Sequence, residues 1–339
     1  MKKVLCILLC AVTALTFFVS CSNSKNAVYK DGRARPSSCG SLKVVDGKLC
    51  SQKGEPVMLR GVSINGLVTS EALLNEELFK ELSKDVGANL FRIANYTYGV
   101  GIVGYCTGGN KERHKEDIAR AVELAKKEDM YAIIDWHILR DGNPNTYIED
   151  AKEFFTEMAQ TYSDYNNVLY EICNEPNGVE WEEVKSYAEE IIPIIRRYDS
   201  DSVIIVGNPD WSKDLYTVSD NPLDFDNIMY TFHFYAATHK DEFRAMVKTV
   251  SHYGLPVFVT EFGVTAASGG HPRDLESADE WIELLEEENI SYCMWAWSKA
   301  PEACSTFKSN VPKTSGFEKE DYTESGIWLL ETLEKRNSL

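Results

Sequence analysis

Short apolar stretches alternate with longer amphipathic stretches from residue 57 to the end of the chain. Each apolar stretch is rich in β-branched and aromatic residues, has the length of a strand, and runs into a polar loop. There are eight such stretches, at residues 57–64, 89–96, 131–137, 167–175, 202–208, 228–235, 256–263 and 292–297. Apolar residues with helical spacing lie between several of them, at residues 114–130, 147–162, 181–198 and 278–290.

Alternation of strand and helix predicts an α/β fold with a parallel sheet, and nearly continuous apolar strands indicate a sheet covered on both faces. Eight such units favour a closed (β/α)8 TIM barrel, which we expect to form one domain over residues 39–339. Residues 42–61 alternate apolar and polar positions around Asp46-Gly47, which predicts a short N-terminal β-hairpin that plugs the bottom of the barrel. No glycine-rich phosphate loop follows the first strand, which argues against a dinucleotide-binding fold.

The N-terminus has the pattern of a bacterial export signal. Residues 1–20 begin with two lysines, continue with an apolar run and end in small residues, which predicts a signal peptide. Cys21 directly follows "FVS" and resembles the acylated cysteine of a lipoprotein, so we expect lipidation at Cys21 and a cell-surface location, with simple cleavage and secretion as the alternative. Residues 21–38 lack an apolar period and are expected to form a flexible tether.

Composition excludes some partners. The 339 residues are 44% apolar, and the 53 acidic against 35 basic residues give a formal charge of −18 without any basic stripe. We therefore expect no nucleic-acid partner, and contact with a membrane only through the lipid anchor. We expect a monomer.

Six of the nine cysteines lie beyond Cys21. Cys39 and Cys50 flank the predicted hairpin, and export makes disulfides feasible. Cys173 and Cys293 lie in apolar strands, where we expect buried free thiols. No pair has the spacing of a zinc site, which argues against a metal site built on sulfur. We expect neither a metal nor a cofactor.

Active sites of (β/α)8 barrels lie at the C-terminal ends of the strands, so polar residues in or just after the apolar runs are the candidates for chemistry. These residues are Arg92, His137, Asn174, Glu175, His233, Tyr235, Glu261 and Trp295. Asp135 precedes His137 by two residues, and we expect it to face the surrounding helices.

Glu175 and Glu261 come from the fourth and seventh runs and are expected to face each other across the barrel mouth. A carboxylate pair can act as acid and base, bind a metal, or hydrolyse a glycosidic bond. The neighbouring arginine, asparagine, tyrosine and tryptophan suit sugar hydroxyls and pyranose faces better than a metal ion, which favours glycoside hydrolysis.

The segments "LFRIANYT", "YAIIDWHIL", "YEICNEPNG", "YTFHFYAATH" and "FVTEFG" resemble those of glycoside hydrolase family 5, in particular its bacterial endo-β-1,4-glucanases. This resemblance extends over residues 41–335. It implies a retaining enzyme in which Glu175 is the general acid/base and Glu261 the nucleophile. It further implies that Asn174 binds the sugar 2-hydroxyl, while Tyr235 and Arg92 keep the nucleophile ionised, Arg92 by lowering its pKa.

The same resemblance places His137 and His233 in the cleavage subsite, with Trp295 stacked under the sugar. Trp211 matches a position that contacts the sugar on the leaving-group side. Two stretches depart from the family pattern. Asn65 stands where close relatives have a histidine and no tryptophan follows it, and the loop after the last strand is shifted, with Lys299 as its candidate sugar ligand.

The sequence thus predicts a retaining endo-1,4-β-glucanase that hydrolyses internal bonds of cellulose or mixed-linkage β-glucan. The same chemistry would serve mannan, xyloglucan or xylan, and the altered loops leave these substrates open. Two other classes are a non-catalytic glycan-binding surface lipoprotein and a metal-dependent hydrolase. Retention of both glutamates argues against the binding protein.

Overall fold

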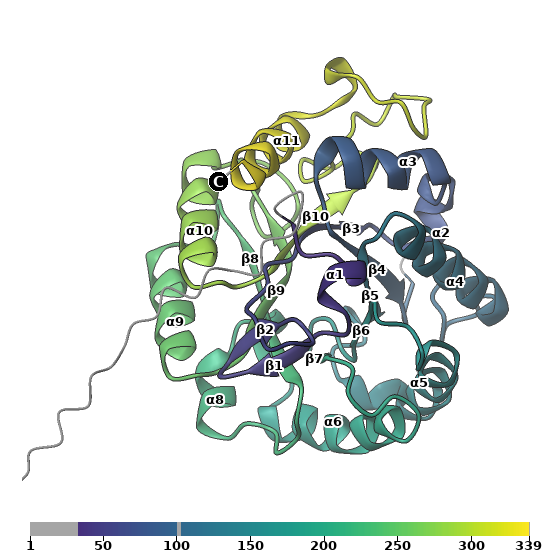
Figure 1. The fold of residues 1–339 in the computed structure, drawn as a ribbon, viewed down its shortest axis with the longest axis vertical. Coiled ribbons are helices and arrows are strands. Elements are labelled where there is room, and N and C mark those ends of the chain that lie inside the picture. The colour runs from purple at the N-terminus through teal and green to yellow at the C-terminus, as the bar shows by residue number, and fades with distance from the viewer. Residues whose placement is uncertain (1–32, 100–102, 339) are drawn as a thin grey trace, which may run out of the picture.

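Eight parallel strands close into a barrel in the part of the chain that the computed structural model describes, residues 33–99 and 103–338. Neighbouring strands follow the chain, and the last pairs with the first. Figure 1 shows the helices as a ring around this barrel. The strands are β3 (Arg60–Ile64), β4 (Leu90–Tyr96), β5 (Tyr131–His137), β6 (Val168–Glu171), β7 (Ile204–Val206), β8 (Ile228–Tyr235), β9 (Val257–Gly263) and β10 (Tyr292–Trp297).

The helices cover the outer face of the sheet with apolar residues three or four positions apart. The long ones are α4 (Lys111–Lys127), α5 (Ile148–Tyr162), α6 (Trp181–Arg196), α9 (Asp241–His252), α10 (Leu275–Glu287) and α11 (Glu324–Asn337). Shorter ones are α2 (Leu67–Ser70), η1 (Glu71–Leu73), α3 (Glu76–Glu81), η2 (Leu82–Val86), η3 (Pro144–Tyr147), α7 (Pro209–Ser212), α8 (Leu215–Asp220) and η4 (Lys319–Asp321). In α5, for example, Phe154, Phe155 and Met158 are buried on one face. None of the described helices combines the length and apolar character needed to cross a bilayer.

The predicted hairpin is confirmed. β1 (Lys43–Val45) and β2 (Lys48–Cys50) pair antiparallel around Asp46 and Gly47, both of which have positive φ. This conformation is that of a two-residue hairpin turn. Leu42 and Leu49 pack with the inward-facing residues of the barrel strands, such as Tyr131 and Ile133, so the hairpin closes the bottom of the barrel (Figure 1).

Residues 33–38, which we expected to belong to a flexible tether, pack instead on the bottom of the barrel. Ala34 is buried, and Arg35 donates to the Ser83 hydroxyl and to the Asp129 carbonyl. Pro36 begins the short helix α1 (Pro36–Cys39). Buried apolar surface and these hydrogen bonds stabilise the segment, which the absence of a sequence period did not reveal. The predicted signal peptide (1–20) and Cys21 lie outside the described residues.

The predicted strand and helix positions are confirmed with shifts of a few residues at their ends. The largest shift is at β6, which ends at Glu171 rather than at residue 175. Cys173 and Cys293 are fully buried free thiols, as expected.

Candidate active site

Glu175 and Glu261 meet at the C-terminal end of the barrel. Glu261 lies in β9, and Glu175 lies four residues beyond β6. Both carboxylates are largely buried, with 8% and 5% of each residue exposed, and they approach to within 4.8 Å. The two acidic groups are therefore close enough to act on one bond.

Arg92 is the centre of the charge network beneath this pair. It lies in β4 and is completely buried. Its Nη1 donates to Glu261 Oε2 at 3.1 Å, and its Nη2 donates to Asn174 Oδ1 at 2.6 Å. It also pairs with Glu171, with 2.7 Å from Nε to Oε2, and with Asp135, with 3.0 Å from Nη2 to Oδ2. One guanidinium thus neutralises part of the charge of three buried carboxylates.

Glu261 accepts hydrogen bonds from two directions, because the Tyr235 hydroxyl donates to its Oε1 at 2.8 Å while Arg92 binds its Oε2. Burial and the neighbouring Glu175 raise the pKa of Glu261, whereas His233 and Arg92 oppose that rise. Arg92 thus lowers this pKa as expected, but burial and the neighbouring carboxylate outweigh the cation, so that the pKa of Glu261 is raised overall.

Glu175 has a different environment. Its Oε1 lies 2.8 Å from Nδ1 of His233. Burial raises the pKa of Glu175 to about 7, although Arg92 and Lys213 act in the opposite direction. A carboxyl with this pKa retains its proton under mildly acidic conditions and releases it near neutral pH.

The expectation that Asp135 faces the helices is wrong. Asp135 is fully buried, and its Oδ2 lies 2.6 Å from Nδ1 of His137 and 3.0 Å from Arg92 Nη2. Residues two apart in a strand share a face, so Asp135 points to the same side as His137. Burial raises the pKa of Asp135 to about 7 and lowers that of His137 to about 3, which leaves the imidazole neutral.

His137, Asn174 and Trp295 line one side of the site. The rings of His137 and Trp295 stack at 5.3 Å with an angle of 10° between their planes. The Asn174 side chain is held by Arg92 and by a 3.0 Å hydrogen bond from its Nδ2 to the Ile138 carbonyl. These side chains are therefore fixed before any ligand binds.

A cavity of about 320 Å³ opens beside Glu175. Its lining residues are Glu175, Trp211, Lys213, His233, Tyr235, His239 and Ala267. Trp211 is 44% exposed and offers an aromatic face to this cavity, with Lys213 Nζ 4.9 Å from the ring centre. An exposed aromatic ring beside a carboxyl group is typical of a sugar-binding position.

The structure does not bring Lys299 to the glutamate pair. Its Nζ donates to the Lys313 carbonyl at 2.9 Å, within the loops that follow β10. Glu302 instead reaches the altered first loop, where Asn65 Nδ2 lies 3.4 Å from its Oε2. The two stretches that depart from the family pattern therefore contact each other.

Glu171 and Thr260 belong to the site although neither was a sequence candidate. Glu171 is fully buried and pairs with Arg92, and the Thr260 hydroxyl lies between it and His233. The one signal in the sequence was an acidic residue within the apolar run 167–175.

The atoms of Glu175, His233 and Glu261 are close enough to hold a metal ion. His233 Nδ1 is already engaged with Glu175, however, and both Arg92 and Tyr235 donate to Glu261. A permanently charged guanidinium 3.1 Å from a ligand oxygen repels a second cation. The donor set therefore does not fit a metal site.

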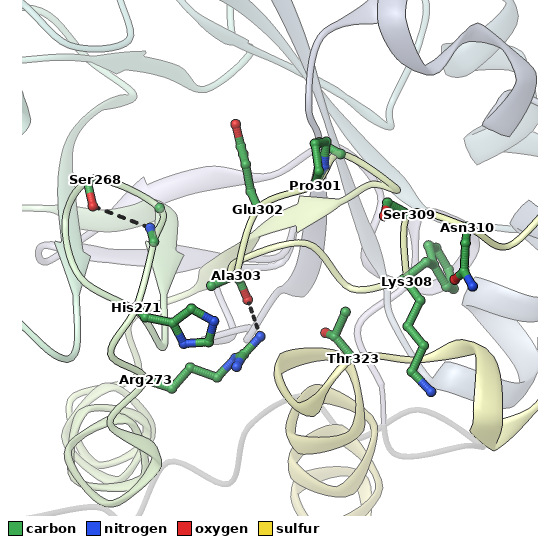
Figure 2. Close-up of a pocket in the computed structure, with 14 residues that line it drawn as sticks. Ser268, His271, Arg273, Pro301, Glu302, Ala303, Lys308, Ser309, Asn310 and Thr323 are labelled. Atoms are coloured by element: carbon green, nitrogen blue, oxygen red, sulfur yellow. Dashed lines mark hydrogen bonds between the residues drawn. The ribbon is translucent and has the colours of Figure 1, made fainter.

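A larger cavity, of about 610 Å³, lies apart from this pair between the loops that follow β9 and β10. Arg273 lines it but is engaged with Ser325 Oγ and the Ala303 carbonyl. Figure 2 shows that Glu302 extends away from His271 and Arg273. The charged groups of this cavity thus do not converge on a common point, and the glutamate pair is the better candidate site.

Comparison with known proteins gives consistent results. A family model described as cellulase (glycosyl hydrolase family 5) matches residues 50–301. The chain is 41% identical over 332 residues to an endoglucanase of Clostridium saccharobutylicum, which covers 97% of this chain and 72% of that protein. It is 43% identical to endoglucanase A of Butyrivibrio fibrisolvens over 87% of this chain and 68% of that protein.

A similar solved structure is the catalytic domain of Thermobifida fusca endoglucanase Cel5A (E5) in complex with cellotetraose. It superimposes with a TM-score of 0.84 at 35% identity, covering 89% of this chain and all of that one.

Proposed function

The chain belongs to the cellulase family, glycosyl hydrolase family 5, and from that premise we propose how its site hydrolyses β-1,4-glucosidic bonds. It is an endoglucanase, and it acts on internal bonds of a β-glucan with retention of configuration. We assign Glu261 as the nucleophile and Glu175 as the general acid/base.

The observation that carries this proposal is the approach of two buried carboxylates to within 4.8 Å. Retaining glycosidases place their carboxyl groups about 5–5.5 Å apart, whereas inverting enzymes need a wider gap for a water molecule. In the first step, Glu261 attacks the anomeric carbon while Glu175 donates its proton to the departing glycosidic oxygen. In the second, Glu175 takes a proton from water, which then cleaves the glycosyl ester.

The surroundings support this division of roles. Two charged carboxylates this close do not ionise independently, so the pair titrates as a unit. Arg92 and Tyr235 donate to Glu261 and favour its ionised form, while the one side chain at hydrogen-bond distance from the Glu175 carboxyl, among the described residues, is the imidazole of His233. The proton of the pair is therefore placed on Glu175.

Side chains around the pair support binding of a glucan chain. Asn174 is held beside Glu175 and is suited to the 2-hydroxyl of the sugar being cleaved, with Trp295 beneath that sugar. Trp211 lies on the leaving-group side of Glu175 and offers a stacking surface for the next sugar. His137 and His233 position these groups. Soluble or amorphous β-1,4-glucan is the proposed substrate.

We further propose that the protein is exported and anchored at the cell surface through Cys21, with release after simple cleavage as the alternative. The support is the N-terminal sequence pattern alone. Labelling of producing cells with an alkyne palmitate analogue tests it: label on the wild-type protein that a Cys21→Ala variant loses would support the anchor. Light scattering of the purified enzyme tests the proposed monomer.

Activity on purified polysaccharides tests the main proposal. We expect more reducing sugar from carboxymethylcellulose and barley β-glucan than from glucomannan, mannan or xylan. Glu175→Gln and Glu261→Gln should each remove most activity while retaining binding of cello-oligosaccharides. Azide should restore turnover of 2,4-dinitrophenyl cellobioside to Glu175→Ala, because this leaving group needs no acid and the anion replaces the base-activated water. Wild-type rates in both glutamine variants would exclude the assigned roles.

A further inference from the structure

The buried carboxylate Glu171 is joined to Glu175 by a continuous chain of hydrogen bonds. Glu175 Oε1 lies 2.8 Å from His233 Nδ1, and His233 Nε2 lies 3.0 Å from Thr260 Oγ1. Thr260 Oγ1 lies 2.7 Å from Glu171 Oε1. None of these four residues is more than 8% exposed, so bulk water does not compete for the hydrogen bonds between them.

The ionised state of Glu171 determines which atom donates in each of these hydrogen bonds. Arg92 binds both oxygens of this carboxylate, with Nε to Oε2 at 2.7 Å and Nη2 to Oε1 at 3.2 Å. Burial raises the pKa of Glu171 and the paired guanidinium opposes that rise. An ionised carboxylate only accepts, so the Thr260 hydroxyl donates to Glu171 and its oxygen accepts from Nε2–H of His233.

His233 then has one ring nitrogen left. Burial lowers the pKa of His233 to about 4, so the imidazole is neutral near pH 6 and carries a single proton. With that proton on Nε2, Nδ1 presents a lone pair to Glu175 at 2.8 Å. A hydrogen bond at this contact requires that Glu175 supply the proton.

We propose that Glu171 is a positioning residue for the acid/base step: through Thr260 it fixes the proton of His233 on Nε2, and His233 Nδ1 then holds the acidic proton of Glu175. The inference rests on the proposed role of Glu175. The reverse arrangement, with Glu171 protonated and Nδ1–H donating to an ionised Glu175, satisfies the same contacts. It would remove the negative charge that Arg92 binds, and this disfavours it.

Other charged and titratable groups also lie near Glu175, His233 and Glu171, and the variants described next leave them unchanged. They are Arg92 and Tyr96 from β4, Asp135 and His137 from β5, Cys173 after β6, Lys213 before α8, Tyr235 from β8, Glu261 from β9 and Cys293 from β10.

Thr260→Val removes the connecting hydroxyl at nearly constant volume. His233 then loses its acceptor at Nε2, and its proton is free to move to Nδ1 and donate to an ionised Glu175. Since this stabilises the ionised carboxyl, the fall of kcat/KM for cellohexaose with rising pH should begin at lower pH. We expect the loss at pH 8 to exceed the loss at pH 5 by about 2- to 13-fold, the size of one neutral hydrogen bond.

Two further variants separate this effect from general damage. Thr260→Ser retains the hydroxyl and should restore the wild-type pH profile. Thr231→Val is a matched control. The Thr231 hydroxyl contacts Thr260 Oγ1 but, among the described residues, forms no hydrogen bond to His233 or Glu171. An equal loss at pH 5 and pH 8 in Thr260→Val, or the same pH shift in Thr231→Val, would overturn the proposal.

The tautomer of His233 can be read directly from 15N spectra of the histidine-labelled wild-type enzyme, which does not depend on any variant folding. We expect the proton on Nε2. A proton on Nδ1 would refute the inference while leaving Glu175 as acid/base intact. Full activity of Glu175→Gln would instead refute the assigned acid/base role, and the inference with it, whatever the tautomer.

Discussion

Replacing Tyr235 by phenylalanine removes a hydroxyl that donates a 2.8 Å hydrogen bond to Glu261 Oε1, and leaves the ring in place. The ring position is fixed by Gly263, where a Cβ atom would lie 2.6 Å from Tyr235 Cδ1. The substitution therefore changes one hydrogen bond and little packing. A hydrogen bond to a charged group contributes about 1.5–3 kcal/mol.

The direction of the pH effect follows from which form of Glu261 the hydroxyl stabilises. The nucleophile reacts as the carboxylate, so activity rises with pH through the pKa of Glu261. Tyr235 donates a stronger hydrogen bond to the ionised form than to the protonated form, so its loss raises that pKa and moves the rise in activity to higher pH. At a tenfold change for each 1.36 kcal/mol, the ionised fraction on the acidic limb should fall by about 13- to 160-fold.

The assay is kcat/KM for 2,4-dinitrophenyl cellobioside from pH 4 to pH 8. This leaving group needs no protonation, so the profile reports Glu261 without the titration of Glu175. We expect a large loss for Tyr235→Phe at low pH and recovery as pH rises. The control is Tyr230→Phe on the same strand, whose hydroxyl accepts from the Leu223 amide and is assigned no bond to either glutamate. A loss of equal size at every pH would refute the reasoning.

Three other substitutions address the network and the cleft. Arg92→Met leaves three buried carboxylates without their cation, so we expect a loss of about 3–5 kcal/mol in the free energy of unfolding at pH 7. That loss should shrink at pH 5 in urea titrations, because buried carboxyls with raised pKa take up protons in the folded state. Asp135→Asn removes a carboxyl whose pKa burial raises to about 7, so its stability relative to wild type should improve as pH rises from 4 to 7; a pH-independent difference would contradict this. Trp211→Ala removes a partly exposed stacking ring, and we expect KM for cello-oligosaccharides to rise about 2- to 13-fold with unchanged thermal stability. An unchanged KM would show that Trp211 does not contribute to substrate binding.

The barrel was predictable because its signals are local. Strands covered on both faces are apolar along their length, and amphipathic helices show their period within four turns. The candidate residues in or just after these strands were therefore conspicuous, and six of them lie around Glu175 and Glu261: Arg92, His137, Asn174, His233, Tyr235 and Trp295. Lys299 does not, since a loop rather than a strand positions it and the loop turns its amine toward the Lys313 carbonyl.

The partners of Arg92 were not predictable to the same degree. Asp135 was predicted to face the surrounding helices, although residues two apart in a strand share a face and His137 was predicted to face the site. Glu171 lay within an apolar run and was not recognised as a site residue. Both are buried because a cation from another strand compensates their charge, and the pairing joins positions 43 and 79 residues from Arg92. A single sequence carries the identity of such residues but not the contact that makes their burial tolerable.

The cost of this buried charge and the separation of the two catalytic roles have the same origin. Burial raises the pKa of both Glu175 and Glu261, so desolvation alone would leave two similar acids. What distinguishes them is the set of neighbours, since one carboxylate meets a guanidinium and a phenol and the other meets a neutral imidazole. Replacing the charged network by apolar residues would relieve its desolvation cost, but it would also remove the donors that place the proton on Glu175. The network is therefore better explained by its role in keeping the proton on Glu175 than by a contribution to the stability of the fold.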